Sequence, residues 1–129
     1  MKQEDKPERS YDLEGRLLEF ATRIVRLTEK LPTTRAGSHI GSQLLRSGTS
    51  PLANHAEAQA AESKKDFVHK MRICHKELRE THRWLELCRR VPLVKPAGTL
   101  DGLIQEADEL IAIFYTSIRT AKAPRSSPR

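Results

Sequence analysis

The sequence predicts an all-α protein, an antiparallel up-down-up-down four-helix bundle. Apolar residues recur at alternating spacings of four and three, and no segment shows the strict period of two typical of a half-buried strand. Pro32 and Pro92 each end an apolar run. With 129 residues the chain is expected to form one domain. We expect a flexible N-terminal arm over residues 1–9, the bundle over residues 10–122, and a disordered basic tail over residues 123–129.

The first helix is predicted from Ser10 to Leu31. Ser10 is a suitable N-cap, and Asp12 and Glu14 place negative charge at the positive end of the helix dipole. Its apolar positions form one seam: Leu13, Leu17, Phe20, Ile24, Leu27 and Leu31.

The second helical segment, about residues 35–61, is built mainly from small residues, which allow helices to approach closely. Thr33-Thr34 forms a short connection before it, with a possible N-cap. Gly48-Thr49-Ser50-Pro51 interrupts the segment. We therefore expect two helical pieces, about 35–47 and 51–61, kinked or broken near Pro51.

A polar motif follows that interruption, formed by Ser50, Pro51, Asn54 and Glu57. One interpretation is structural: the polar side chains bond the backbone freed by proline or hold neighbouring helices together. The other is a ligand or partner site, although nothing else in the segment supplies chemistry.

The third helix carries the clearest apolar seam in the chain. Ser63 with Asp66 forms the pattern of a capping box, and the helix is expected to run to Arg90 before Pro92 stops it. The seam consists of Phe67, Met71, Cys74, Leu78, Thr81, Leu85 and Cys88.

After a turn-rich linker over residues 91–98, Thr99 is expected to cap the fourth helix. Acidic residues crowd the first half of this helix, and Arg119 and Lys122 lie at its end, as the helix dipole favours. Its apolar positions are Leu100, Leu103, Ala107, Leu110, Phe114 and Ile118.

Composition excludes several classes of protein. No apolar run approaches the roughly 20 residues of a membrane span, and no secretory leader is visible, so we expect a cytoplasmic protein. Cys74 and Cys88 lie about 21 Å apart along one helix and cannot pair. The His and Cys spacings match no metal site, and no catalytic or cofactor motif is present. We therefore expect no metal, no cofactor and no enzymatic activity.

Residues 63–90 hold most of the chain's excess charge. They contain nine Lys and Arg against four Asp and Glu, and so carry +5 of the formal net charge of +6. Six cationic or titratable residues form what we call the basic stripe, two positions out of phase with the apolar seam and so turned away from the core: Lys65, His69, Arg72, Lys76, Arg79 and Arg83.

The basic stripe has three interpretations. Rows of cations on one helix face suit the phosphate backbone of RNA or DNA. Alternatively the stripe is a solvated face in which Glu77, Glu80 and Glu86 neutralise the cations. In a third interpretation it meets the acidic start of helix four on a neighbouring protomer. Only Trp84 supplies an aromatic ring at the edge of the stripe, so base stacking is not expected.

Several segments resemble a bacterial family of four-helix-bundle proteins, named after proteins encoded in intervening sequences of large-subunit ribosomal RNA genes. The resemblance covers roughly residues 11–94, and residues 95–129 match only as a generic fourth helix. The segments that carry it are Leu31-Pro32, residues 35–37, 43–58, 63–70, 76–81 and 84–87.

This resemblance implies a four-helix protomer that assembles into a homo-oligomer, a pentameric ring. The accessory proteins of diversity-generating retroelements are similar in fold, and they use a basic barrel surface to engage a reverse transcriptase and nucleic acid. For most members of the family no activity is established. The alternative function is a purely structural, scaffolding oligomer that binds another protein and no nucleic acid.

Overall fold

The computed structural model describes residues 12–124, and over this range the chain is all-helical. The elements are α1 (Leu13–Lys30), α2 (Arg35–Gln59), α3 (Lys64–Arg90), the short 3-10 helix η2 (Ala97–Leu100) and α4 (Asp101–Lys122). The predicted all-α fold with four helices is confirmed. The predicted arm over residues 1–9, the predicted cap Ser10 and residues 125–129 of the predicted tail lie outside the described residues.

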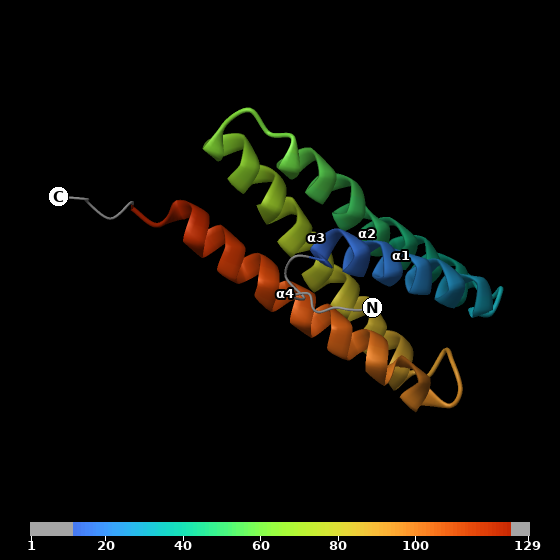
Figure 1. Cartoon of the computed structure of the whole chain (residues 1–129). Coiled ribbons are helices and arrows are strands. Elements are labelled where there is room, and N and C mark those ends of the chain that lie inside the picture. Colours follow the sequence, from blue (N-terminus) through green and yellow to red (C-terminus); the bar gives the residue numbers. More distant parts are fainter. Residues whose placement is uncertain (1–11, 125–129) are drawn as a thin grey trace, which may run out of the picture.

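The helices pack mainly against their neighbours in the sequence. α2 contacts both α1 and α3, α3 contacts α4, and α1 touches α4 only slightly. Figure 1 shows that α1 covers one part of the bundle and does not extend to the end where α3 begins and α4 ends. That end is therefore built from α2, α3 and α4.

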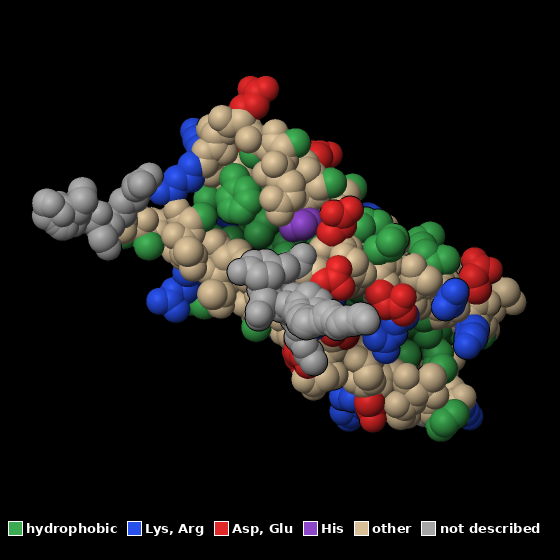
Figure 2. All heavy atoms as spheres, in the orientation of Figure 1, with side chains coloured by type: hydrophobic (Ala, Val, Ile, Leu, Met, Phe, Trp, Pro, Cys, Tyr) green, Lys and Arg blue, Asp and Glu red, His purple; other side chains and the backbone are tan. Residues whose placement is uncertain are grey.

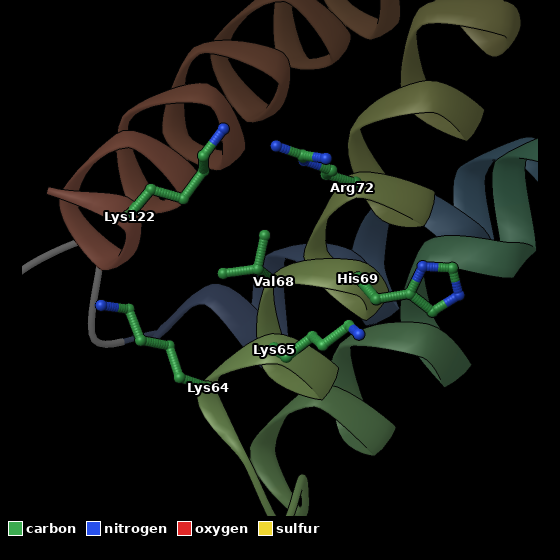
Figure 3. A pocket seen from close by; sticks show the side chains of 6 residues that line it. All are labelled: Lys64, Lys65, Val68, His69, Arg72 and Lys122. Atoms are coloured by element: carbon green, nitrogen blue, oxygen red, sulfur yellow. The ribbon is translucent and has the colours of Figure 1, made fainter.

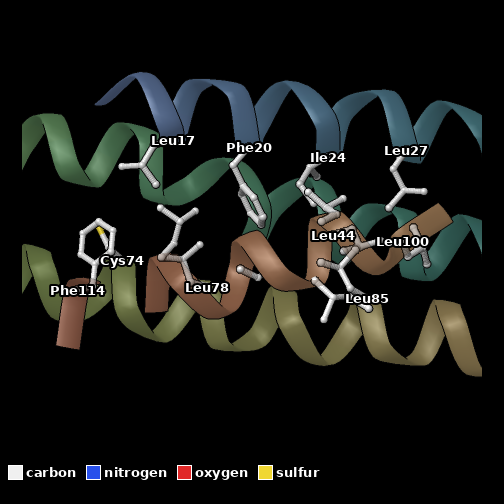
Figure 4. Close-up of a cluster of buried hydrophobic side chains, with 14 of the residues drawn as sticks. Leu17, Phe20, Ile24, Leu27, Leu44, Cys74, Leu78, Leu85, Leu100 and Phe114 are labelled. Carbon is white, nitrogen blue, oxygen red and sulfur yellow. The ribbon is translucent and has the colours of Figure 1, made fainter. Parts of the chain in front are cut away.

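The apolar seams predicted from the sequence form one buried core (Figure 4). The first seam, five residues of α1 and its C-cap Leu31, is entirely buried. The seam residues of α3 are also buried, except Phe67, which is half-buried. In α4 the seam is buried up to Phe114, and Ile118 is half-buried. Burial of this apolar surface is the main favourable contribution to folding.

Of the three predicted N-caps that lie among the described residues, two are confirmed; α1 has Asp12 as its N-cap, without a side-chain hydrogen bond. The Thr34 side chain accepts a hydrogen bond from the Gly37 amide at 3.0 Å, and that of Ser63 accepts one from the Asp66 amide at 3.0 Å. The prediction for Thr99 is wrong, because this residue lies inside η2 and α4 follows without a side-chain cap. The preceding 3-10 turn leads directly into the first turn of α4.

Helix α2 is continuous through Pro51 rather than two separate pieces. At Gly48, α2 packs so closely against α1 that a Cβ atom there would lie 2.8 Å from two carbon atoms of Ile24. One turn from Pro51, the buried hydroxyl groups of Ser47 and Thr81 lie 2.8 Å apart and join α2 to α3. Whether the axis of α2 bends at Pro51 stays a prediction.

Candidate nucleic-acid interface

The basic stripe lies on the solvent-exposed side of α3. All six of its residues are exposed. Among residues 12–124, no acidic side chain forms an ion pair with any of them. The stripe therefore presents its positive charge to solvent, and no ion pair within this part of the chain holds its side chains.

The glutamates nearest the stripe are directed to other partners. Arg46 of α2 forms an ion pair with Glu77 at 2.9 Å and another with Glu80. Glu86 lies 3.5 Å from His82 on the same helix. The sequence allowed ion pairs between these glutamates and the stripe. Within the described residues, the glutamates instead pair with Arg46 and His82.

The acidic start of α4 is also paired within the protomer. Arg16 of α1 bonds to Glu106 at 2.8 Å and to Glu109 at 2.9 Å, and the carboxylate of Glu106 binds it through both oxygens. These carboxylates raise the pKa of Arg16, with the hydrogen bond to Glu106 as the largest cause. Two further pairs join α3 to α4, Arg89–Asp101 at 2.9 Å and His82–Asp108 at 3.0 Å.

Helix α4 extends the stripe at the end of the bundle that α1 does not cover. An open pocket of about 620 Å³ lies between the start of α3 and the end of α4. Figure 3 shows Lys122 and Arg72 extending toward each other across it, with Val68 in the space below them. The pocket is lined by Lys64, Lys65, Val68, His69, Arg72 and Lys122.

We call the six residues of the stripe together with Lys64, Arg119 and Lys122 the basic face. Figure 2 shows Lys and Arg side chains at the end of the molecule where α3 begins and α4 ends. Lys64 and Lys65 occupy the first turn of α3, where the partial positive charge of the helix N-terminus adds to theirs. The arrangement suits a phosphate-bearing ligand.

A second pocket of about 570 Å³ adjoins the first and shares Arg72 and Lys122 with it. It contains Tyr115 of α4, whose ring lies 6.2 Å from the ring of His75 and 5.9 Å from the guanidinium carbon of Arg119. Burial lowers the pKa of His75, and the charge of Arg79 lowers it further, so its ring is uncharged at neutral pH.

The aromatic ring expected at the edge of the stripe has a different role. The indole nitrogen of Trp84 donates to Glu80 at 3.0 Å, and its ring meets His39 of α2 edge-on at 6.0 Å. Trp84 therefore belongs to the contact between α2 and α3. The aromatic residue beside the basic face is Tyr115.

The polar motif of α2 makes contacts within the fold. The amide nitrogen of Asn54 donates to the carbonyl oxygen of Ser50 at 3.1 Å and lies 2.9 Å from its hydroxyl oxygen. Glu57 forms an ion pair with Lys70 of α3 at 2.7 Å. Pro51 is buried, and its carbonyl oxygen lies 3.6 Å from the sulfur of Cys74.

The other reactive side chains are enclosed in the core. Both cysteines are free and buried, and burial raises the pKa of Cys74 to about 12 and that of Cys88 to about 11. These thiols are protonated at neutral pH and are poor nucleophiles. Within residues 12–124, no group of three or more His, Cys, Asp or Glu could hold a metal ion, and no helix is long and apolar enough to cross a membrane.

Sequence reasoning identified the stripe but missed its continuation on α4. Tyr115, Arg119 and Lys122 recur at spacings of four and three, which places them on one helix face. That signal was available in the sequence. It did not reveal that this face lies beside Arg72, because the contact joins residues far apart in the chain.

The comparisons with known proteins agree with this architecture. Residues 13–116 match the family described as 23S rRNA-intervening sequence protein. Among solved structures, the chain is similar to a protein of unknown function from the S23 ribosomal protein family of Bacteroides thetaiotaomicron VPI-5482, with a TM-score of 0.78 and 33% identity over 87% of this chain and 99% of that one. No curated protein matches the chain. Since the family match spans most of the helices, the chain belongs to the 23S rRNA-intervening sequence protein family.

Proposed function

We propose that this protein is a non-enzymatic, cytoplasmic bacterial accessory protein whose basic face binds the phosphate backbone of RNA or DNA. The observation that carries the proposal is the exposure of all six residues of the basic stripe without an acidic partner in the described part of the chain. Like charges gathered in this way repel one another, and a polyanion relieves that repulsion while releasing its own counterions.

The ion pairs of the neighbouring acids favour this function over the other two interpretations of the stripe. Glu77 and Glu80 bind Arg46, so they do not neutralise the stripe. The acids at the start of α4 bind Arg16, His82 and Arg89 of the same chain, so they are less available to a neighbouring protomer.

We also propose that the protein forms a homo-oligomer, a pentameric ring as the family resemblance implies, through α1 and α2. Leu18 and Val25 of α1 and Leu45 of α2 are large apolar side chains that remain exposed in the single chain. Such residues are commonly buried at subunit contacts. This location would leave the basic face on α3 and α4 open to nucleic acid.

These apolar side chains also favour the second candidate function, a scaffolding oligomer that binds another protein and no nucleic acid. A protein partner such as a reverse transcriptase suits either function. The two functions differ in what the basic face does, and charge reversal on that face separates them.

The proposed bundle has neighbouring helices that alternate in direction, with α2 bent at Pro51. Two contacts support the alternation of α3 and α4. Lys64 at the start of α3 and Lys122 at the end of α4 line one pocket. At the other end, Arg89 near the end of α3 bonds Asp101 at the start of α4.

The test measures binding of labelled RNA and DNA by fluorescence anisotropy across a salt series. We expect measurable binding at low salt that weakens steeply as salt rises. The variant Arg72→Glu, Lys76→Glu, Arg79→Glu should abolish it. A matched control, Arg26→Glu, Lys30→Glu, Arg35→Glu, reverses three exposed cations elsewhere, and both variants reduce the formal charge from +6 to 0.

Light scattering on the same samples reports the mass of the assembly. If the wild-type protein binds neither RNA nor DNA at low salt, or if both triple variants lose binding equally while the assembly keeps its wild-type mass, a specific basic face is ruled out. If the wild-type protein binds no nucleic acid and reversal on α3 changes the mass, the result favours the scaffolding function. A wild-type monomer would contradict the proposed oligomer.

A further inference from the structure

Two adjoining pockets on the basic face combine cationic side chains with an exposed aromatic ring. The first is surrounded by cations of α3 and α4, and the second contains Tyr115. Arg72 and Lys122 line both pockets, so a ligand bound by these two side chains would lie directly beside the tyrosine ring.

The exposure of Tyr115 is not explained by packing of the core. Its neighbour Phe114 is fully buried and supplies the aromatic core residue of this turn, whereas 54% of Tyr115 is exposed. In the described part of the chain, the ring of Tyr115 contacts the ring of His75 and the guanidinium of Arg119. Aromatic rings and guanidinium planes are the groups on which proteins stack unpaired bases.

We propose that Tyr115, with His75 beside it, stacks on an unpaired base while Arg72 and Lys122 bind the adjacent phosphates, so that the basic face prefers single-stranded nucleic acid. This inference rests on the proposed function and adds the class of nucleic acid to it. A base in a duplex is already stacked and paired, and cannot reach a ring on a helix surface without first leaving the duplex.

Helix geometry places the required groups together. Tyr115, Arg119 and Lys122 lie on one face of α4, and Arg72 and His75 lie one turn apart on the facing part of α3. The base would enter the second pocket, and the sugar-phosphate chain would continue along the stripe toward Lys76 and Arg79. Stacking on Tyr115 requires no particular base, because every base has a flat π face.

The experiment compares binding of a mixed-sequence single strand of about 16 nucleotides with binding of a duplex of the same length, using RNA and DNA as separate probes. Tyr115→Leu removes the aromatic face and keeps an apolar side chain. We expect it to weaken single-strand binding roughly 5- to 100-fold and to leave duplex binding unchanged. Tyr115→Phe should retain wild-type affinity for the single strand.

Leu87→Ala is the matched control, since Leu87 is an exposed apolar residue elsewhere on α3. It should bind every probe as the wild-type protein does. A single strand with an abasic backbone supplies phosphates without bases, and we expect the wild-type protein to bind it as weakly as Tyr115→Leu binds the intact strand.

The possible failures are distinguishable. If no probe binds, the proposed function itself is wrong. If single strand and duplex bind equally and Tyr115→Leu changes neither, the basic face stands and the stacking role is overturned. If Tyr115→Leu binds every probe as the wild-type protein does but changes the mass of the assembly, Tyr115 lies at a subunit contact, and the stacking role is also overturned. Preference for either RNA or DNA single strands supports the inference.

Discussion

At Gly48 the absence of a single carbon atom allows α1 and α2 to pack closely. The position is buried, and a Cβ atom added there would lie 2.8 Å from each of the two γ-carbons of Ile24. Both belong to a β-branched side chain with little freedom to rotate in a helix. Gly41 is also buried in α2, but there the nearest atom, a methyl carbon of Leu31, lies 3.4 Å away.

We therefore predict opposite effects of the same substitution at these two glycines. Gly48→Ala should destabilise the protein by about 1–3 kcal/mol, because overpacking outweighs the gain in helix propensity. Gly41→Ala should be neutral or stabilising by up to about 1 kcal/mol. Denaturant unfolding monitored by circular dichroism measures both. Equal effects at the two positions would show that Ile24 does not limit the approach of α1 and α2.

Each cation of the basic face contributes to phosphate binding together with the cations around it. Arg72 lines both pockets, and its environment contains Lys122 from another helix rather than a carboxylate. An isolated exposed cation contributes little to binding. Several cations around one pocket create a positive potential that a phosphate group can neutralise.

At the scale of helices, α2 and α3 are joined by polar contacts as well as by the core. The hydroxyl groups of Ser47 and Thr81 are fully buried and lie 2.8 Å apart, and the Thr81 oxygen is also 2.8 Å from the carbonyl oxygen of Glu77. Since a hydroxyl has one proton, Thr81 can donate to Glu77 while it accepts from Ser47. This pair is satisfied only when both helices are in register.

A double-mutant cycle tests the pair. Ser47→Ala and Thr81→Val should each cost about 1–3 kcal/mol, and the double variant should cost less than their sum, with a coupling of about 0.5–1.5 kcal/mol. Thr22 provides the control, because its exposed hydroxyl bonds to Leu18 within α1. Thr22→Val combined with Thr81→Val should be additive. Additivity in the Ser47–Thr81 cycle would mean that the hydroxyl contact does not stabilise the helix pair.

In the molecule as a whole, the basic face and the apolar residues of the proposed subunit contact lie on different helices. The basic face lies on α3 and the end of α4, whereas Leu18, Val25 and Leu45 are exposed on α1 and α2. This division would allow a homo-oligomer to form without covering the basic face.

The interior also makes the stability of the whole fold sensitive to acid. His55 is buried against Phe114, and burial lowers its pKa, with a smaller opposing effect of Glu14. Burial likewise lowers the pKa of His75. Each histidine binds protons more readily in the unfolded chain than in the folded protein. The free energy of unfolding should therefore be highest above the unfolded pKa of about 6.5 and fall as the pH decreases below it.

The measurement is denaturant unfolding at several values between about pH 7.5 and pH 5, where histidine rather than carboxylate titration dominates. In the variant His55→Gln, His75→Gln the loss of stability over this interval should be smaller than in the wild-type protein. An unchanged pH dependence would show that other groups are responsible.

Local patterns in the sequence are sufficient to predict the class of fold, the four helices and nearly all of the core. Those features depend on local spacing. The periodicity of apolar residues alone identifies the buried face of the helices over residues 13–31 and 71–88. The caps at Thr34 and Ser63 were predictable for the same reason, since each involves residues three apart. The exposure of the basic stripe also followed from its phase relative to the seam.

The residues that lie beside the stripe depend on how the helices pack. Lys122 and Tyr115 reach Arg72 only because α4 packs on α3, and Arg46 removes Glu77 and Glu80 from the stripe only because α2 packs on the other side. These contacts join residues more than 30 positions apart, and no local period encodes them. Spacing along one helix specifies which face is polar, whereas the chemistry of that face depends on the helices packed against it.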